Sequence, residues 1–209
     1  MNSYFSLKDM SVAEIEIKKS RFIAQAFPVK TEDEAIELIR RVKKDNPQAR
    51  HNVYAFSVRE NNVKRFSDDG EPSGTGGKPI LDIIEHMELQ DILIVVTRYF
   101  GGILLGTGGL QRAYGGAAKE AVENGTIIEM SASVVAQMSF DYSYYQSLLK
   151  ILDNYTHSII DSEFSNEVNL TFAVKIEAYQ KIREKVVDLT NGRVNIKKEE
   201  EKIYFFEKQ

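Results

Sequence analysis

Cysteine and tryptophan are absent from the 209 residues of this chain, and proline (4 residues) and histidine (3 residues) are scarce. Without cysteine the chain can form no disulfide, no thiolate zinc site and no cysteine nucleophile. It also has no apolar run near the roughly 20 residues that a membrane-spanning helix needs. The first residues show no basic segment followed by an apolar core, so we expect no signal peptide. These absences predict a soluble, cytoplasmic protein that does not associate with membranes.

A large excess of charge of one sign is also lacking. The chain carries 27 basic and 31 acidic residues, which gives a net charge of −4. Such a balance does not predict a general nucleic-acid binder, and no DNA specificity is expected. Contact with RNA would have to come from a local basic patch.

Glycine is present but unevenly spread, since eleven of the 13 glycines lie between Gly70 and Gly116. Hydrophobic periodicity and turn residues predict an α+β chain with a domain boundary near residues 131–133. In the first domain (1–132) we expect a hairpin over 12–27, a helix from 31 to 46, strands over 52–58 and 63–66, a helix over 80–87, a buried strand over 91–97 and a helix ending near 124. In the second (133–209) we expect strand 134–140, a helix carrying residues 145–152, strands 157–164 and 168–176, a helix carrying residues 182–189 and a strand region over 194–206. The second set has the order βαββαβ of a ferredoxin-like sandwich.

The later glycine cluster follows the buried strand and opens a helix. Its candidate residues for binding phosphate or RNA are Arg98, Gly101, Gly102, Gly106, Thr107, Gly108, Gly109 and Arg112. Backbone N–H groups at a helix start lack partners, and glycines let an anion approach them closely. Arg98 and Arg112 could both face one oxyanion. The pattern fits neither the P-loop nor the dinucleotide fingerprint, and a tight strand-to-helix turn is the structural alternative.

The earlier cluster, D-D-G-E-P-S-G-T-G-G-K-P at 68–79, combines carboxylates with glycine and proline. Its carboxylates could ligate a hard cation such as magnesium. They could instead pair with Arg98 or Arg112 and so fix one loop against the other, which is the reading we favour. The residues expected to support the site are His51, Asp68, Asp69, Glu71, Thr75 and Lys78.

Other side chains leave alternatives open. His51 could do acid–base work, although a lone histidine is usually structural. The basic run at 40–44 could contact nucleic acid or form a solvated helix face. Tyr99, Phe100 and Tyr114 could stack on bases or pack in the core. The sequence provides no hydrolase triad, and we assign no catalytic residue. Because we favour loop fixing for the carboxylates, we also assign no metal ligand, and we expect no cofactor.

Several motifs together resemble the IMPACT family, in its bacterial branch, over essentially the whole chain. They are K-S-R-F at 19–22, A-x-H at 49–51, D-D-G-E-P-S-G-T at 68–75, T-R-Y-F-G-G at 97–102 and G-x-G-G-L-x-R-A-Y at 106–114. The resemblance implies an N-terminal α/β domain like the second domain of a small-subunit ribosomal protein and domain four of elongation factor G. It also implies a C-terminal ferredoxin-like domain like the last domain of that factor.

The resemblance also implies a function. Eukaryotic relatives regulate translation through protein contacts with the machinery that controls an initiation-factor kinase, but they carry a different partner domain. For bacterial members it implies a role linked to RNA or the ribosome. Two positions depart from the family pattern: Leu104 replaces a common lysine, which removes a cation from the proposed cradle, and Gly76 replaces alanine.

We therefore expect a non-enzymatic protein that binds RNA or the ribosome and is linked to regulation of translation. One alternative is an enzyme acting on a phosphorylated or nucleotide substrate, with His51 or Asp69 in acid–base work. Another is a protein-interaction module of translation control, with a translation-related protein as its partner.

Overall fold

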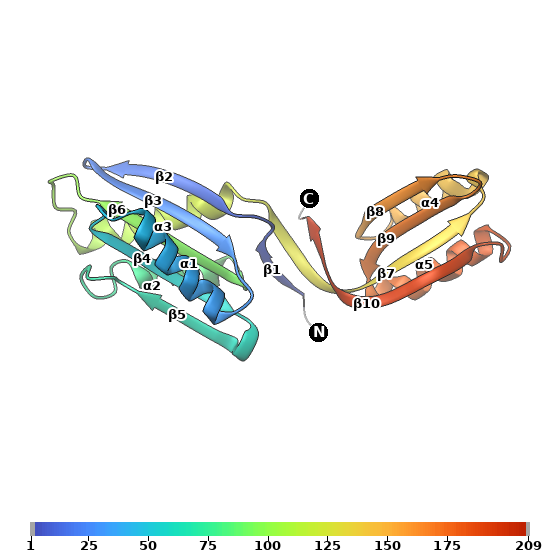
Figure 1. The fold of residues 1–209 in the computed structure, drawn as a ribbon, viewed down its shortest axis with the longest axis horizontal. Coiled ribbons are helices and arrows are strands. Elements are labelled where there is room, and N and C mark those ends of the chain that lie inside the picture. Colours follow the sequence, from blue (N-terminus) through green and yellow to red (C-terminus); the bar gives the residue numbers. More distant parts are fainter. Residues whose placement is uncertain (1–2, 208–209) are drawn as a thin grey trace. The chain divides into compact units, whose positions relative to one another are not determined.

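The computed structural model describes residues 3–207, which divide into two compact units (Figure 1). One unit comprises Tyr4–Ile128 with Glu207, and the other comprises Glu129–Phe206 with Ser3. The described residues form two five-stranded antiparallel sheets and five α-helices. The predicted α+β class is therefore correct. In this described part, no helix is both long and apolar enough to cross a membrane.

The sheet of the first unit has the strand order β2-β3-β6-β4-β5. Its strands are β2 (Ser11–Ile17), β3 (Ser20–Pro28), β4 (His51–Val58), β5 (Val63–Ser67) and β6 (Ile92–Tyr99). The apolar, β-branched sequence of β6 places it at the centre, where seven of its eight residues are buried. The predicted strand covered on both faces is thus confirmed, and it extends to Tyr99.

Helices cover both faces of this sheet. Successive side chains of a strand point to opposite faces, so the apolar strand β6 presents apolar side chains to both. Ile92, Ile94 and Val96 of β6 belong to a core cluster that includes residues of α2 (Gly77–His86) and α3 (Thr107–Glu123). Leu93 and Val95 belong to a second cluster with residues of α1 (Glu32–Asp45). Figure 1 shows α1 lying across this sheet.

The three helices of the first unit begin differently. Thr31 caps α1, since its hydroxyl accepts a hydrogen bond from Glu34 N at 3.1 Å, as predicted. At the start of α2, backbone amides donate hydrogen bonds to the carboxylate of Asp68 in the preceding loop. By contrast, α3 begins after Gly106 (φ 72°) with no side-chain cap and no acidic residue in its first turn. The first amides of α3 are therefore left for another acceptor.

The second unit follows the predicted element order. It contains β7 (Ile127–Phe140), α4 (Tyr145–Leu152), β8 (His157–Phe164), β9 (Val168–Lys175), α5 (Ile176–Leu189) and β10 (Asn195–Glu207). The sheet runs β8-β9-β7, and β10 also pairs with β7. Alternate residues of β7 and β9 pack against α4 and α5 in one core cluster. In the first unit, the sequence-based prediction missed the short strand β1 (Tyr4–Leu7).

Candidate functional site

The loop between β5 and α2 is organised by the carboxylate of Asp68. One oxygen accepts hydrogen bonds from Gly76 N at 2.9 Å and Gly77 N at 2.8 Å, and the other accepts from Gly74 N at 2.8 Å. Asp68 therefore supplies the missing cap of α2. Partial burial raises the pKa of Asp68, but the three amide hydrogen bonds outweigh burial and hold the pKa below its ordinary value.

Asp69 connects the same loop to α1 and β4. Its carboxylate accepts from Lys43 Nζ at 2.6 Å and from Asn52 N at 2.7 Å. Its carbonyl oxygen lies 2.7 Å from His51 Nδ1, so neutral His51 donates from Nδ1 and leaves Nε2 without a proton. The loop thus fixes the orientation of the imidazole ring.

Glu71 makes the contact that joins the two loops. Its Oε1 accepts from Arg98 Nη1 at 2.5 Å and from Tyr114 Oη at 2.8 Å. The Arg98 and Glu71 side chains are only 6% and 4% exposed. Burial and the neighbouring Glu71 carboxylate raise the pKa of Tyr114, which remains a hydrogen-bond donor. Of the two arginines considered for a carboxylate of this loop, Arg98 is the one that is paired.

The three carboxylates of this loop serve three different partners. Asp68 binds backbone amides, Asp69 binds Lys43, and Glu71 binds Arg98. Residues 3–207 contain no group of three or more side chains of the metal-ligating kind placed to hold an ion together. The contacts of these carboxylates are those of groups that fix the loop.

A cavity of about 350 Å³ lies between the two loops. It is lined by Arg50, His51, Gly70, Glu71, Pro72, Arg98, Phe100, Leu104, Leu105, Gly106, Thr107 and Leu110. One part of the wall is therefore cationic and polar, and another part is apolar. The guanidinium carbons of Arg50 and Arg98 each lie 5.5 Å from the centroid of the Phe100 ring. Phe100 itself is 39% exposed.

Two features of this cavity lack an internal partner. Arg98 is buried, yet its Nε donates no hydrogen bond to any described residue. The start of α3 is uncapped, and a Cβ built at Gly106 or Gly108 would meet no atom within 4 Å. Chain packing therefore does not explain glycine at position 108, and open space adjoins the first amides of α3.

The predicted cradle residues divide between this cavity and other places. Gly106, Thr107 and Arg98 line the cavity, whereas Gly108 and Arg112 are exposed on α3 and are not among the lining residues. The expectation that Arg98 and Arg112 face one oxyanion is not supported by this placement, because Arg112 does not line the cavity.

The remaining glycines of the cradle have distinct surroundings. At Gly101 a Cβ would lie 2.0 Å from the carbonyl carbon of Lys19, so glycine is needed there for packing. Gly102 is exposed with φ 85°, a conformation that favours glycine. Gly109 lies in the first turn of α3, where its Cβ would be 3.1 Å from Leu105 Cβ. None of these three lines the cavity.

Two expected supporting residues act locally. Thr75 is buried, and its hydroxyl donates to Pro72 O at 2.6 Å within the loop. Lys78 pairs with Asp82 one turn later along α2. Neither lines the cavity.

Arg50 is a cavity residue that sequence reasoning missed, and Phe100 was considered only as one of three aromatics. Arg50 directly precedes His51, and Phe100 ends the T-R-Y-F segment, so a signal for both was present. Tyr99 instead donates to Asn46 Oδ1 at 2.8 Å, and Tyr114 is buried. Only Phe100 of the three aromatics lines the cavity.

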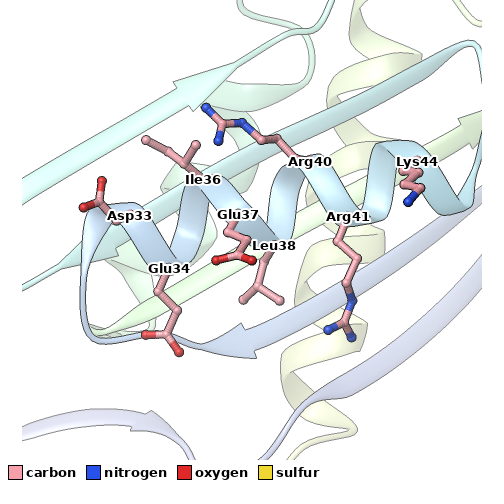
Figure 2. Close-up of a pocket in the computed structure, with 8 residues that line it drawn as sticks. All are labelled: Asp33, Glu34, Ile36, Glu37, Leu38, Arg40, Arg41 and Lys44. Carbon is pink, nitrogen blue, oxygen red and sulfur yellow. The ribbon is translucent and has the colours of Figure 1, made fainter.

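The basic run of α1 lies in a different setting. Figure 2 shows side chains around a pocket whose lining residues all belong to α1. Acidic residues occupy the first half of the helix, and Arg40, Arg41 and Lys44 occupy the last half. Acidic side chains near the start of a helix and basic ones near its end interact favourably with the helix dipole. Lys43 points elsewhere, to Asp69. The charges of α1 are thus explained without a ligand.

Comparison with known proteins gives matches over both units. The Impact N-terminal domain model matches residues 18–122, and the Domain of unknown function (DUF1949) model matches residues 138–193. A solved structure described as the crystal structure of a hypothetical protein aligns with a TM-score of 0.60 and 31% identity. It covers 94% of this chain and 97% of that chain.

Several relatives carry the family name. IMPACT family member YvyE of Bacillus subtilis (strain 168) is 37% identical over 96% of this chain and 93% of its own length. IMPACT family member YigZ of Escherichia coli (strain K12) is 33% identical over 87% of this chain and 90% of its own. Protein IMPACT of Rattus norvegicus is 31% identical over 45% of this chain and 31% of its own length. With near full-length similarity and the matching domain model, this chain belongs to the IMPACT family.

Proposed function

We propose that this chain is a non-enzymatic cytoplasmic protein that binds RNA, free or on the ribosome, in a role linked to regulation of translation. The observation that carries the proposal is the cavity at which Arg50, Phe100 and the uncapped start of α3 meet. Family membership supports the link to translation, because the resemblance implies that role for eukaryotic relatives.

The chemistry of the cavity suits RNA better than a purely apolar or purely ionic ligand. Free amides at a helix start and a nearby guanidinium attract phosphate. A half-exposed aromatic ring offers a stacking surface for an unpaired base. Arg50 is exposed and already lies near the Phe100 ring, so both can contact one nucleotide. Because the net charge is −4, binding would depend on this local arrangement.

The two units support the domain assignment of this proposal. The βαββαβ order and the strand pairing β8-β9-β7-β10 of the second unit favour a ferredoxin-like domain over 133–209. The first unit then corresponds to the domain over 1–132 that resembles the second domain of a small-subunit ribosomal protein. Both assignments suit a protein that works beside the translation machinery.

The experiment is RNA binding by fluorescence anisotropy with single-stranded RNA over a range of salt concentrations. Arg50→Ala should weaken binding about tenfold and reduce the salt slope by about one, as expected for loss of one phosphate contact. Phe100→Ala should weaken binding with little change in slope, because stacking does not release counterions. The matched control is Arg41→Ala, which removes the same charge from the outer face of α1. If Arg41→Ala weakens binding as much as Arg50→Ala does, this site is wrong.

A second function is favoured by one observation, the setting of His51. Its ring is fixed by Asp69 O, lines the cavity, and places Nε2 3.8 Å from the buried Glu71 carboxylate. A positioned imidazole of this kind suits proton transfer in an enzyme acting on a phosphorylated or nucleotide substrate. Turnover of nucleotides or phosphate esters that is abolished in His51→Gln would establish this function in place of simple binding.

A further inference from the structure

The cavity holds more positive than negative character. Arg50 and Arg98 face it with Glu71 as the carboxylate among its lining residues, and the positive end of the α3 dipole adds to them. With neutral His51, the formal charge of the lining is therefore +1. An anionic group is the ligand that this lining favours.

Arg98 supplies the observation that points to a ligand. The residue is 5% exposed, its Nη1 is bound to Glu71, and its Nε has no partner. A buried donor without an acceptor is costly, and such groups are rare in folded proteins. An anionic oxygen that enters the cavity would lie near the Arg98 guanidinium and the first amides of α3, and both would attract it.

The apolar part of the cavity wall limits which group can be attached to the anion. Phe100, Leu104, Leu105 and Leu110 form an apolar surface that suits a base or another flat ring. The loop tip continues this apolar character, since Leu104 is 82% exposed and Ile103 precedes it. Ile103 and Leu104 carry no charge, so the loop tip offers no cation that would bind a second phosphate. The volume of about 350 Å³ also lies at the small end of ligand sites, which span roughly 300–1,000 Å³.

We propose that the cavity binds a terminal nucleotide of RNA that carries a phosphomonoester, rather than an internal stretch of the RNA backbone. The phosphate would lie against the first amides of α3 with Arg50 and Arg98, and the base against Phe100. A phosphomonoester carries close to two negative charges near neutral pH, whereas an internal phosphodiester carries one. It is therefore the more strongly attracted group at a net positive lining beside a helix start. This inference rests on the RNA-binding function proposed above.

The test compares three versions of one short single-stranded oligoadenylate: with a 5′-phosphate, with a 3′-phosphate, and with hydroxyls at both ends. Each is labelled at an internal position, and binding to the full chain is measured by anisotropy at one salt concentration. One of the phosphorylated ends should bind about tenfold tighter than the hydroxyl form. The arm that gains identifies the end, and adenosine monophosphate phosphorylated on the same side should compete.

Two variants keep the test specific. Thr107→Glu should preserve the fold, because residue 107 is exposed in the first turn of α3, and should reduce the preference for the phosphorylated end, because residue 107 lines the cavity and a carboxylate there repels the anion. Arg41→Ala should leave that preference intact. Equal binding of all three oligonucleotides, still weakened by Arg50→Ala, would overturn end recognition while leaving RNA binding in place. No binding of any oligonucleotide would overturn both proposals.

Discussion

The buried pair of Glu71 and Arg98 gives the sharpest prediction about stability. Glu71→Ala removes the anion that lies 2.5 Å from Arg98 and the acceptor that lies 2.8 Å from the Tyr114 hydroxyl. Both partners stay buried and do not regain full hydration. Breaking a buried pair by removing one member costs about 3–5 kcal/mol. With a urea dependence of about 2 kcal/mol per molar, the unfolding midpoint of the first unit should fall by roughly 1.5–2.5 M.

The assay must report on the first unit separately. Hydrogen exchange of peptides from β3 and β6 at increasing urea does so, and peptides from β9 serve as an internal reference that should not change. The double variant Glu71→Leu with Arg98→Met removes both charges and should be far closer to the original protein than the sum of the single variants. A loss below about 1 kcal/mol in Glu71→Ala would refute the reasoning, as would simple additivity of the two changes.

Three further predictions concern the loops. Asp68→Asn should lower the free energy of unfolding by about 2 kcal/mol at neutral pH. Because the pKa of Asp68 is lowered in the folded protein, the stability that its carboxylate contributes is present above about pH 4 and is lost as the pH falls through the folded pKa. The urea midpoints of the two proteins should therefore converge in acid. Gly101→Ala should cost more than about 3 kcal/mol because its Cβ would lie 2.0 Å from backbone, whereas Gly108→Ala should stay within about 1 kcal/mol of the original, as judged by thermal unfolding. The pKa of Tyr114 is raised in the folded protein, so above about pH 10 this hydroxyl ionises more readily in the unfolded chain and the free energy of unfolding falls. Tyr114→Phe should lose about 1–3 kcal/mol of stability at neutral pH. Its stability should also decline less steeply at alkaline pH in the same assay.

Much of the fold could be predicted from local sequence. The apolar run that forms β6, the Thr31 cap of α1 and the strand alternation in the second half follow from short-range rules. The short strand Tyr4–Leu7 could not, because four residues are too few to show an alternation of buried and exposed positions.

The site was predictable in composition but not in roles. The sequence indicated that both glycine loops and a carboxylate–arginine pair are involved, and Glu71 does pair with Arg98. It could not decide which arginine would be buried: Arg98 is the last residue but one of the buried strand β6, whereas Arg112 lies on the exposed side of α3. Arg50 entered the cavity because β4 and β6 pair side by side, with His51 opposite Arg98. Such cross-strand register is not contained in either motif alone.

The most direct test of the central claim is a chemical-shift titration of ¹⁵N-labelled protein with phosphorylated oligoadenylate. Binding at the start of α3 should give the largest backbone changes at Thr107, Gly108 and Gly109, accompanied by Arg50 and Phe100, and no change at Arg41. Binding whose shift changes fall on α1 or on the second unit, with the first turn of α3 unmoved, would contradict it.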